Sequence, residues 1–284
     1  ISSINIETPK SSVEGKLGSF HYDHKRINRF ANNVTYFSKT AISIADGEHQ
    51  LTIKLNGQGK LSFYATSGCI GFSFINYSNE QFYGGGMQFS HVRLNGQRFV
   101  NLCEENGIGR GDSPISKWTK MVGVVGEKYS SYYPVPFIVS DQNRGVSVNS
   151  STLSTFDFGT NQTDVFIQGK EVDLQLYQAA QILDIIQDFN AQNGRGNAIP
   201  NWALGSIIGI QGGTDRVKSI VEPMLNNEIP VRGIWIQDWV GKRQTKLGSR
   251  LDWKWQLDTT YAEIFAFASA NDLKVLGYIN PFFA

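Results

Sequence analysis

The sequence predicts a chain of mixed class, in which an all-β sandwich precedes the start of a parallel (β/α)8 barrel. Short segments that alternate apolar and polar residues run to about residue 177, and apolar strands separated by helical stripes follow. We therefore expect a sandwich over residues 1–178, a linker with a short helix over 179–200, and three β/α units over 201–284.

The sandwich is predicted from strand periodicity and turn residues. Apolar residues alternate with polar ones over 51–55 and again over 61–63, and Asn56, Gly57 and Gly59 lie between the two segments. That combination is typical of a β-hairpin. The same alternation over 172–176 predicts a strand near the end of the domain, and short strands punctuated by Gly, Asn and Ser favour a sandwich.

Helical spacing replaces the strand period after this point. Ile182, Leu183, Ile186 and Phe189 follow that spacing and predict the linker helix. Residues 203–210 are apolar on both faces, which is typical of a buried parallel strand.

Two further β/α units are predicted in the same way. We expect Thr214 to cap a helix whose apolar stripe is Val217, Ile220, Val221, Met224 and Leu225. Residues 233–236 and 275–279 are the next strands. Between them, Thr260 and Glu263 predict a capping box for a helix that turns Tyr261, Ile264, Phe265 and Ala268 inward. Crossovers of this length imply parallel strands.

Composition excludes several classes of protein. The 26 Lys and Arg balance 25 Asp and Glu, so no basic surface indicates a nucleic-acid partner, and no long apolar run indicates a membrane span. Cys69 and Cys103 are expected to be thiols or core residues, with a single bridge as the alternative. His21 and His24 would face opposite sides of a strand, so no metal site is predicted.

The compartment is left open. Four Asn-x-Ser/Thr sequons and a start at Ile1 rather than Met favour a secretory or lysosomal protein, although about this many sequons would arise by chance. A cytoplasmic protein is the alternative.

Functional residues of a β/α barrel lie at the C-terminal ends of its strands. The first predicted strand ends at Gln211 and the second at Gln237 and Asp238. Amide and carboxylate groups bind sugar hydroxyls, so these positions indicate a sugar site. The alternative is that they are ordinary polar loop residues.

A basic segment follows the second strand, over residues 240–255. It carries two tryptophans and several cations, among them Arg250 and, three positions later, Trp253. Since Arg offers a rigid fork of donors, the segment predicts recognition of an anionic group. A solvated basic loop with tryptophans packed below it is the alternative.

At these residues the sequence resembles glycoside hydrolase family 31 and, within it, the sulfoquinovosidases. Residues 82–90 (FYGGGMQFS), 106–111 (NGIGRG) and 132–137 (YYPVPF) look like segments of that subfamily. The subfamily binds its sulfonated sugar with a Gln, Gln, Arg, Trp, Tyr set. The first four match residues of this sequence at the right spacing: Gln211, Gln237, Arg250 and Trp253.

The resemblance implies roles for these residues. Arg250 and Trp253 would contact the sulfonate, and Gln211, Gln237 and Asp238 would bind sugar hydroxyls. It also implies a mutarotase-like sandwich whose loop reaches the active site, which makes Gln88 a possible active-site residue. Met87 stands where the family usually carries an acid.

The implied activity is that of a retaining α-glycosidase that hydrolyses α-sulfoquinovosides without a cofactor. Its nucleophile and acid/base aspartates belong to later barrel strands, so we expect them beyond Ala284 and assign no catalytic residue in this chain. A second polypeptide that completes the barrel is a possible partner. The alternatives are a family 31 α-glucosidase or α-galactosidase with a neutral substrate, and a non-catalytic sugar-binding or structural module.

Overall fold

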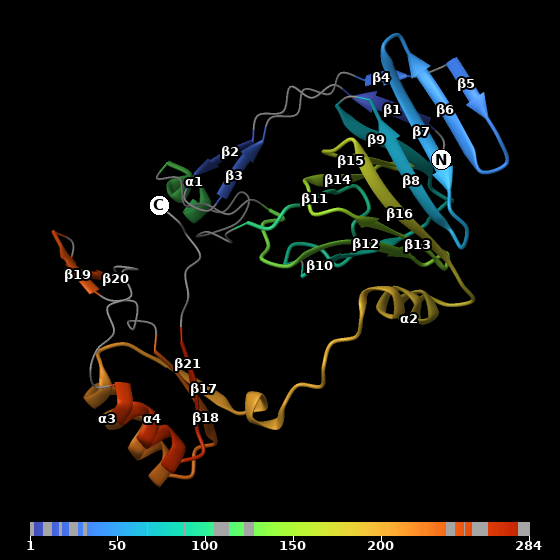
Figure 1. The fold of residues 1–284 in the computed structure, drawn as a ribbon. Coiled ribbons are helices and arrows are strands. Elements are labelled where there is room, and N and C mark those ends of the chain that lie inside the picture. The colour runs from blue at the N-terminus through green and yellow to red at the C-terminus, as the bar shows by residue number, and fades with distance from the viewer. Residues whose placement is uncertain are drawn as a thin grey trace. The chain divides into compact units, whose positions relative to one another are not determined.

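The computed structural model describes most of the chain and divides it into two units. The described residues are 3–7, 13–16, 19–22, 28–30, 33–66, 68–87, 89–104, 114–121, 128–236, 242–246, 248–251 and 261–277. The first unit comprises residues 1–195 and the second residues 196–284 (Figure 1). Each unit is considered by itself below.

Two antiparallel sheets make up the first unit (Figure 1). The described strands of one sheet have the order β11 (Arg98–Asn101), β14 (Ser154–Phe158), β15 (Gln162–Ile167), β9 (Cys69–Ile75), β1 (Ser3–Glu7) and β4 (Asn28–Phe30). Those of the other have the order β10 (Phe82–Gly86), β12 (Pro134–Ser140), β13 (Arg144–Asn149), β16 (Glu171–Gln178), β8 (Lys60–Ala65), β7 (His49–Leu55), β6 (Ala41–Asp46) and β5 (Asn33–Phe37). A separate hairpin joins β2 (Val13–Lys16) to β3 (Ser19–Tyr22).

The hairpin predicted from turn chemistry is confirmed. Strands β7 and β8 pair in antiparallel register from Leu51 with Ala65 to Leu55 with Leu61, and the backbone bond from Lys60 N–H to the Gly57 carbonyl oxygen closes the turn. The strand predicted at 172–176 is also confirmed, as β16.

The core of the first unit lies between the two sheets, as expected of a sandwich-type domain. One buried cluster takes residues from both sheets, for example Phe63 and Leu174 from one and Phe72 and Phe156 from the other. The rings of Phe63 and Phe72 stack across the interface with centroids 5.5 Å apart. Burial of this apolar surface stabilises the sandwich.

Two helices accompany the sheets. The predicted linker helix is α2 (Ile182–Asn193), which packs on the eight-stranded sheet through the buried Ile185 and the ring of Phe189. The other helix, α1 (Pro114–Met121), corrects the expectation that the first domain is all-β. Cys69 and Cys103 are both thiols, the former buried in β9 and the latter exposed.

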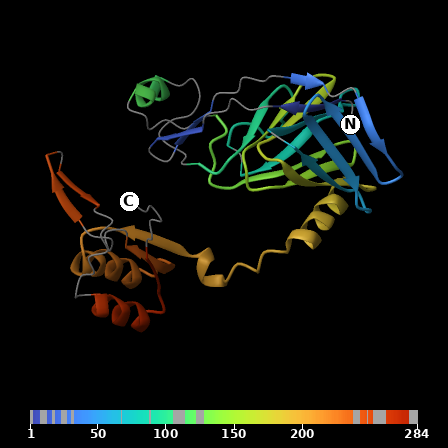
Figure 2. The same ribbon diagram turned by 45° about the horizontal axis from the view of Figure 1, so that its top comes forward.

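The second unit contains a small parallel sheet with a helix in each crossover. After a 3₁₀ turn, η1 (Asn201–Leu204), come β17 (Ser206–Ile210), α3 (Thr214–Asn226), β18 (Val231–Ile236), α4 (Tyr261–Ala270) and β21 (Lys274–Leu276). Strand β18 lies between β17 and β21 and is parallel to both. Helices α3 and α4 lie side by side against these strands (Figure 2).

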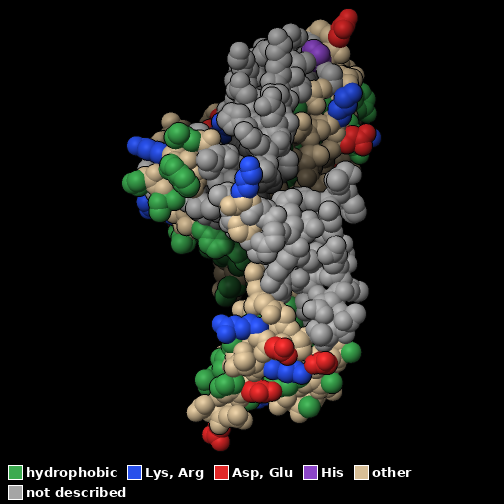
Figure 3. Space-filling view, turned by 90° about the vertical axis from the view of Figure 1, so that its left-hand side faces the viewer, with side chains coloured by type: hydrophobic (Ala, Val, Ile, Leu, Met, Phe, Trp, Pro, Cys, Tyr) green, Lys and Arg blue, Asp and Glu red, His purple; other side chains and the backbone are tan. Residues whose placement is uncertain are grey.

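The apolar stripe of α3 is confirmed. Val217 and Val221 are buried in a cluster with Ile234 of β18 and Ile264 of α4, and Ile220, Met224 and Leu225 pack against it. Charges of both signs are interspersed on the described surface of this unit (Figure 3), and Lys218 of α3 pairs with Glu263 of α4 at 3.2 Å.

Several local predictions for the second unit are wrong. Residues 203 and 204 belong to η1. Strand β17 is apolar on both faces but packs only one of them: Ile208 and Ile210 contact the core, whereas Ile207 on the other face is exposed. Gly213, not Thr214, is the N-cap of α3, and Thr214 is buried in the first turn. Phe265 points outward with 53% of its surface exposed, while Phe267 packs against the core instead.

Other predictions fall outside the described residues. They include Thr260 of the expected capping box and the end of the third predicted strand, from residue 278 onward. None of the helices in the described part of the chain has the length and hydropathy that crossing a membrane requires.

Candidate functional site

The first predicted site residue lies where expected, directly after a parallel strand. Strand β17 ends at Ile210, and Gln211 follows it with an exposed side chain. Gly212 then adopts a φ of 117°, a left-handed backbone that favours glycine and redirects the chain into α3. The sequence thus places an amide group at the carboxyl edge of the sheet, where ligands of such folds bind.

The second strand ends beside the first. Ile236, the last described residue of β18, is the register partner of Ile210. Gln237 and Asp238 lie outside the described residues, as do Trp253 and Gln88. Their predicted roles therefore stay predictions.

Arg250 is described through its backbone, in a hairpin that the sequence analysis treated as a basic loop. Strands β19 (Lys242–Thr245) and β20 (Gly248–Leu251) pair in antiparallel register, with Lys242 opposite Leu251 and Arg243 opposite Arg250. Basic residues of the segment therefore lie in two paired strands rather than in an irregular loop.

In the first unit, two of the segments that carry the family resemblance lie against each other. Strand β10 contains the start of FYGGGMQFS and pairs with β12, which contains most of YYPVPF. The pairing is irregular between Gly84 and Gly86. Gly86 has a φ of 79°, and a Cβ atom there would collide with the backbone of Tyr133 and Val135. A glycine is therefore required for the two segments to approach this closely.

The loop that leaves β10 is held by hydrogen bonds on both sides of Met87. Its backbone N–H donates to the Tyr133 carbonyl oxygen at 2.9 Å, and the Ser131 hydroxyl donates to the Met87 carbonyl oxygen at 2.8 Å. Nearby, the buried Ser130 hydroxyl donates to the Glu104 carboxylate at 2.6 Å. Met87 is 50% exposed, so an apolar group faces solvent at the position where the family resemblance implied an acid.

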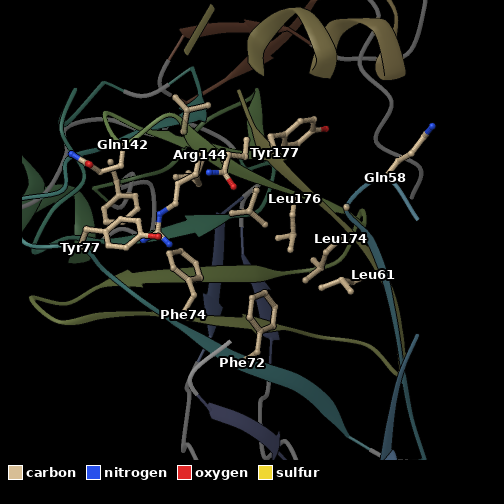
Figure 4. A pocket seen from close by; sticks show the side chains of 17 residues that line it. Gln58, Leu61, Phe72, Phe74, Tyr77, Gln142, Arg144, Leu174, Leu176 and Tyr177 are labelled. Atoms are coloured by element: carbon tan, nitrogen blue, oxygen red, sulfur yellow. The ribbon is translucent and has the colours of Figure 1, made fainter. Parts of the chain in front are cut away.

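A cavity of about 540 Å³ opens between the two sheets of the sandwich. Its walls are mostly apolar, and Figure 4 shows Arg144 reaching into it between Phe74 and Tyr77. The Arg144 guanidinium lies 4.4 Å from the Tyr77 ring centroid and donates from Nε to the buried Glu80 carboxylate at 2.6 Å. This cavity lies at the Phe82 end of β10, whereas the Met87 loop leaves from the other end.

The electrostatics of this ion pair follow from its burial. Burial raises the pKa of the Glu80 carboxyl, but hydrogen bonds from Arg144, Ser140 and the Tyr77 backbone outweigh that effect and lower the pKa below its usual 4.5. Glu80 is therefore a structural carboxylate that neutralises Arg144. The described residues that line this cavity all belong to the first unit.

Metal ions in proteins require a set of ligand side chains gathered around one point. Within the residues that the structure describes, no three His, Cys, Asp or Glu side chains gather as metal ligands would.

Comparison with known proteins gives the class to which this architecture corresponds. No protein-family profile matches the chain. Among solved structures, it resembles a GH31 family sulfoquinovosidase from E. rectale, solved in complex with an aza-sugar inhibitor. The TM-score is 0.81 and the identity 26%, over 98% of this chain and 44% of that one.

Curated sequences agree with the structural likeness. The chain is 27% identical to a sulfoquinovosidase of Agrobacterium fabrum over 93% of its own length and 42% of the relative's. It is 30% identical to a sulfoquinovosidase of Escherichia coli over 72% of its length and 31% of the relative's. The chain therefore spans less than half the length of the relatives that it matches.

These likenesses confirm the resemblance predicted from the sequence. The chain is a relative of the enzymes of glycoside hydrolase family 31. Within that family, two of the proteins that it resembles over nearly its whole length are sulfoquinovosidases.

Proposed function

We propose that this chain is the N-terminal part of a retaining α-glycosidase that hydrolyses α-sulfoquinovosides. The observation that carries the proposal is the likeness to sulfoquinovosidases, which extends over 98% of the chain in structure and 93% in sequence. The position of Gln211 at the end of a parallel strand supports it, because that is where a sugar-binding amide of a β/α barrel belongs.

In this proposal the domains have the limits expected from the sequence: a sandwich over 1–178, a linker over 179–200, and the first three units of a (β/α)8 barrel over 201–284. The sandwich supplies the loop that contains Met87 and Gln88. The barrel supplies sugar contacts at the ends of its strands, Gln211 after β17 and Gln237 with Asp238 after β18.

The anionic end of the sugar is bound by the basic segment after β18. Arg250 and Trp253 donate to the sulfonate, which stays ionised and accepts several hydrogen bonds. A guanidinium fork and an indole N–H are suitable partners for such a group, because both are donors without an acceptor atom.

The catalytic pair lies in the part of the relatives' length that this chain does not span. One carboxylate attacks the anomeric carbon, and the second protonates the leaving group and then activates water. That part is supplied either by continuation of the same polypeptide or by a second polypeptide. No described residue is assigned to either catalytic role.

The experiment uses the protein completed to the length of its relatives. It compares kcat/KM for 4-nitrophenyl α-sulfoquinovoside and 4-nitrophenyl α-glucoside, and proton NMR of the first product identifies its anomer. Preference for the sulfonated substrate with an α-anomeric first product supports the proposal. Better cleavage of the glucoside would indicate a neutral-sugar enzyme, and binding of sulfoquinovose without hydrolysis would indicate a non-catalytic module.

A further inference from the structure

The hairpin after β18 brings two arginines to directly opposite positions. Arg243 of β19 is the register partner of Arg250 of β20, although seven positions separate them in sequence. The neighbouring cation, Lys242, is instead the partner of Leu251. The backbone pairing therefore distinguishes two adjacent basic residues that look alike in the sequence.

Register partners in an antiparallel pair share one face of the ribbon, about 4.5–5.5 Å apart at Cβ. Successive residues of a strand belong to opposite faces. Positions 243 and 250 therefore share a face, and Lys242 belongs to the other one.

Two like charges at directly opposite positions destabilise a strand pair. Among the described residues this sheet consists of β19 and β20, so the two arginine positions face each other across a single strand pair. An anion shared by the two positions removes the conflict, because each guanidinium then has a neighbouring negative charge. The register thus points to a binding site for one compact anionic group.

We propose that Arg243 is a second specificity-determining residue, which acts with Arg250 on the sulfonate of the substrate. The inference rests on the proposed function, since it takes Arg250 as the sulfonate-binding residue. A sulfonate has three equivalent oxygens, enough to accept from two separate guanidinium groups. Arg243 belongs to none of the sequence segments or residues that carried the family resemblance.

The test measures KM and kcat of the completed protein with 4-nitrophenyl α-sulfoquinovoside. The variants are Arg243→Gln, its conservative counterpart Arg243→Lys, the matched control Lys242→Gln from the opposite face, and Arg250→Gln. Melting temperatures of all variants are recorded, and the assays are repeated with the neutral 4-nitrophenyl α-glucoside.

We expect Arg243→Gln to raise KM for the sulfonated substrate about tenfold or more, the effect of losing one charge-assisted hydrogen bond. Arg243→Lys should raise it less, because it keeps the charge, and Lys242→Gln should leave it within about twofold of wild type. Cleavage of the glucoside should not change with the Arg243 variants. The melting temperature of the free protein should not fall, because Arg243→Gln removes a like-charge repulsion and Arg243→Lys keeps the charge.

The inference is overturned if both Arg243 variants match Lys242→Gln. It is also overturned if Arg243→Gln and Arg243→Lys impair both substrates equally, which would indicate a structural role. If Arg250→Gln nevertheless impairs cleavage of the sulfonated substrate and spares the glucoside, either result leaves the proposed function standing. If wild type does not prefer the sulfonated substrate, the proposed function itself fails.

Discussion

Ile210 and Ile236 are register partners at the ends of two parallel strands, β17 and β18. Because both strands run in the same direction, the chain leaves the same edge of the sheet after each of them. The residues that follow, Gln211 and Gln237, are the two glutamines that match the sugar-binding set of the sulfoquinovosidases. The register thus gives a structural basis for treating these distant positions as parts of one site.

Replacement of Gln211 by Ala tests this site at the residue that follows β17. In the completed protein we expect kcat/KM for the α-sulfoquinovoside to fall about threefold to tenfold, because an uncharged hydrogen bond contributes about 0.5–1.5 kcal/mol. Gln50→Ala, at an exposed position of β7, is the control and should change nothing. Equal kinetics for the two variants would remove Gln211 from the site.

The close approach of β10 to the segment before β12 is tested at Gly86. Gly86→Ala introduces both a strained φ and a collision with the Tyr133 and Val135 backbone. Gly96→Ala introduces a similar φ of 68° with nothing within 4 Å of the new Cβ. We expect Gly96→Ala to cost about 1–2 kcal/mol.

The Gly86 substitution should cost at least about 1 kcal/mol more than the Gly96 one, because overpacking adds to the strain. Urea denaturation followed by circular dichroism measures both free energies. Similar losses for the two variants would show that the backbone at Gly86 has room for a side chain.

The docking of α2 on the sandwich is tested at Phe189. Its ring stacks on that of Phe137 with centroids 4.0 Å apart and planes 7° from parallel. We expect Phe189→Ala to lower the free energy of unfolding by about 2–3 kcal/mol, somewhat less than for a fully buried Phe. Leu183→Ala, on the same helix but 64% exposed, should stay within about 0.5 kcal/mol of wild type. Equal losses of unfolding free energy for Phe189→Ala and Leu183→Ala would contradict the docking of α2.

The Glu80–Arg144 pair predicts a pH-dependent contribution to stability. Since the pKa of Glu80 is lower in the folded protein than its usual 4.5, its contribution is complete above pH 4.5 and is lost as pH falls through the folded value. We expect Glu80→Gln to destabilise the protein by about 2–4 kcal/mol at pH 7, and by progressively less below pH 4.5.

Urea titrations of wild type and Glu80→Gln at pH 7 and near pH 3.5 measure this difference. Glu171→Gln, an exposed carboxylate at the start of β16, is the control and should show a small difference at both values. A difference for Glu80→Gln that is unchanged or larger in acid would contradict the assignment.

Local features of the fold could be predicted from the sequence. The β7–β8 hairpin follows from its turn residues, and the stripe of α3 follows from its 3.6-residue period, because both depend on neighbours in sequence. The exposure of Ile207 on β17 could not be predicted, since an apolar run does not tell whether both faces of the strand are covered. That depends on segments distant in sequence.

Helix α1 could not be predicted from the sequence for a different reason. It buries Ser116 and Thr119 and exposes Ile115, Trp118 and Met121, the reverse of what the period rule assumes. Neither its short length nor its composition distinguishes it from a loop.

The candidate site was predictable to a similar extent. The position of Gln211 after a strand was predicted because strand ends are recognisable in sequence, whereas the contact between Ser131 and Met87 was not predicted. That contact joins positions 44 apart, and a single serine in a loop carries no signal. Likewise, the pairing of Arg243 with Arg250 depends on the register of a hairpin in a segment that reads as a basic loop.

The most direct test of the central claim is the specificity of an Arg250→Ala variant of the completed protein. The quantity to measure is the ratio of kcat/KM for 4-nitrophenyl α-sulfoquinovoside to that for 4-nitrophenyl α-glucoside. A sulfonate-binding Arg250 predicts that the ratio falls at least about tenfold, through loss of about 1.5–3 kcal/mol on the sulfonated substrate alone. A ratio that stays at the wild-type value would contradict the account.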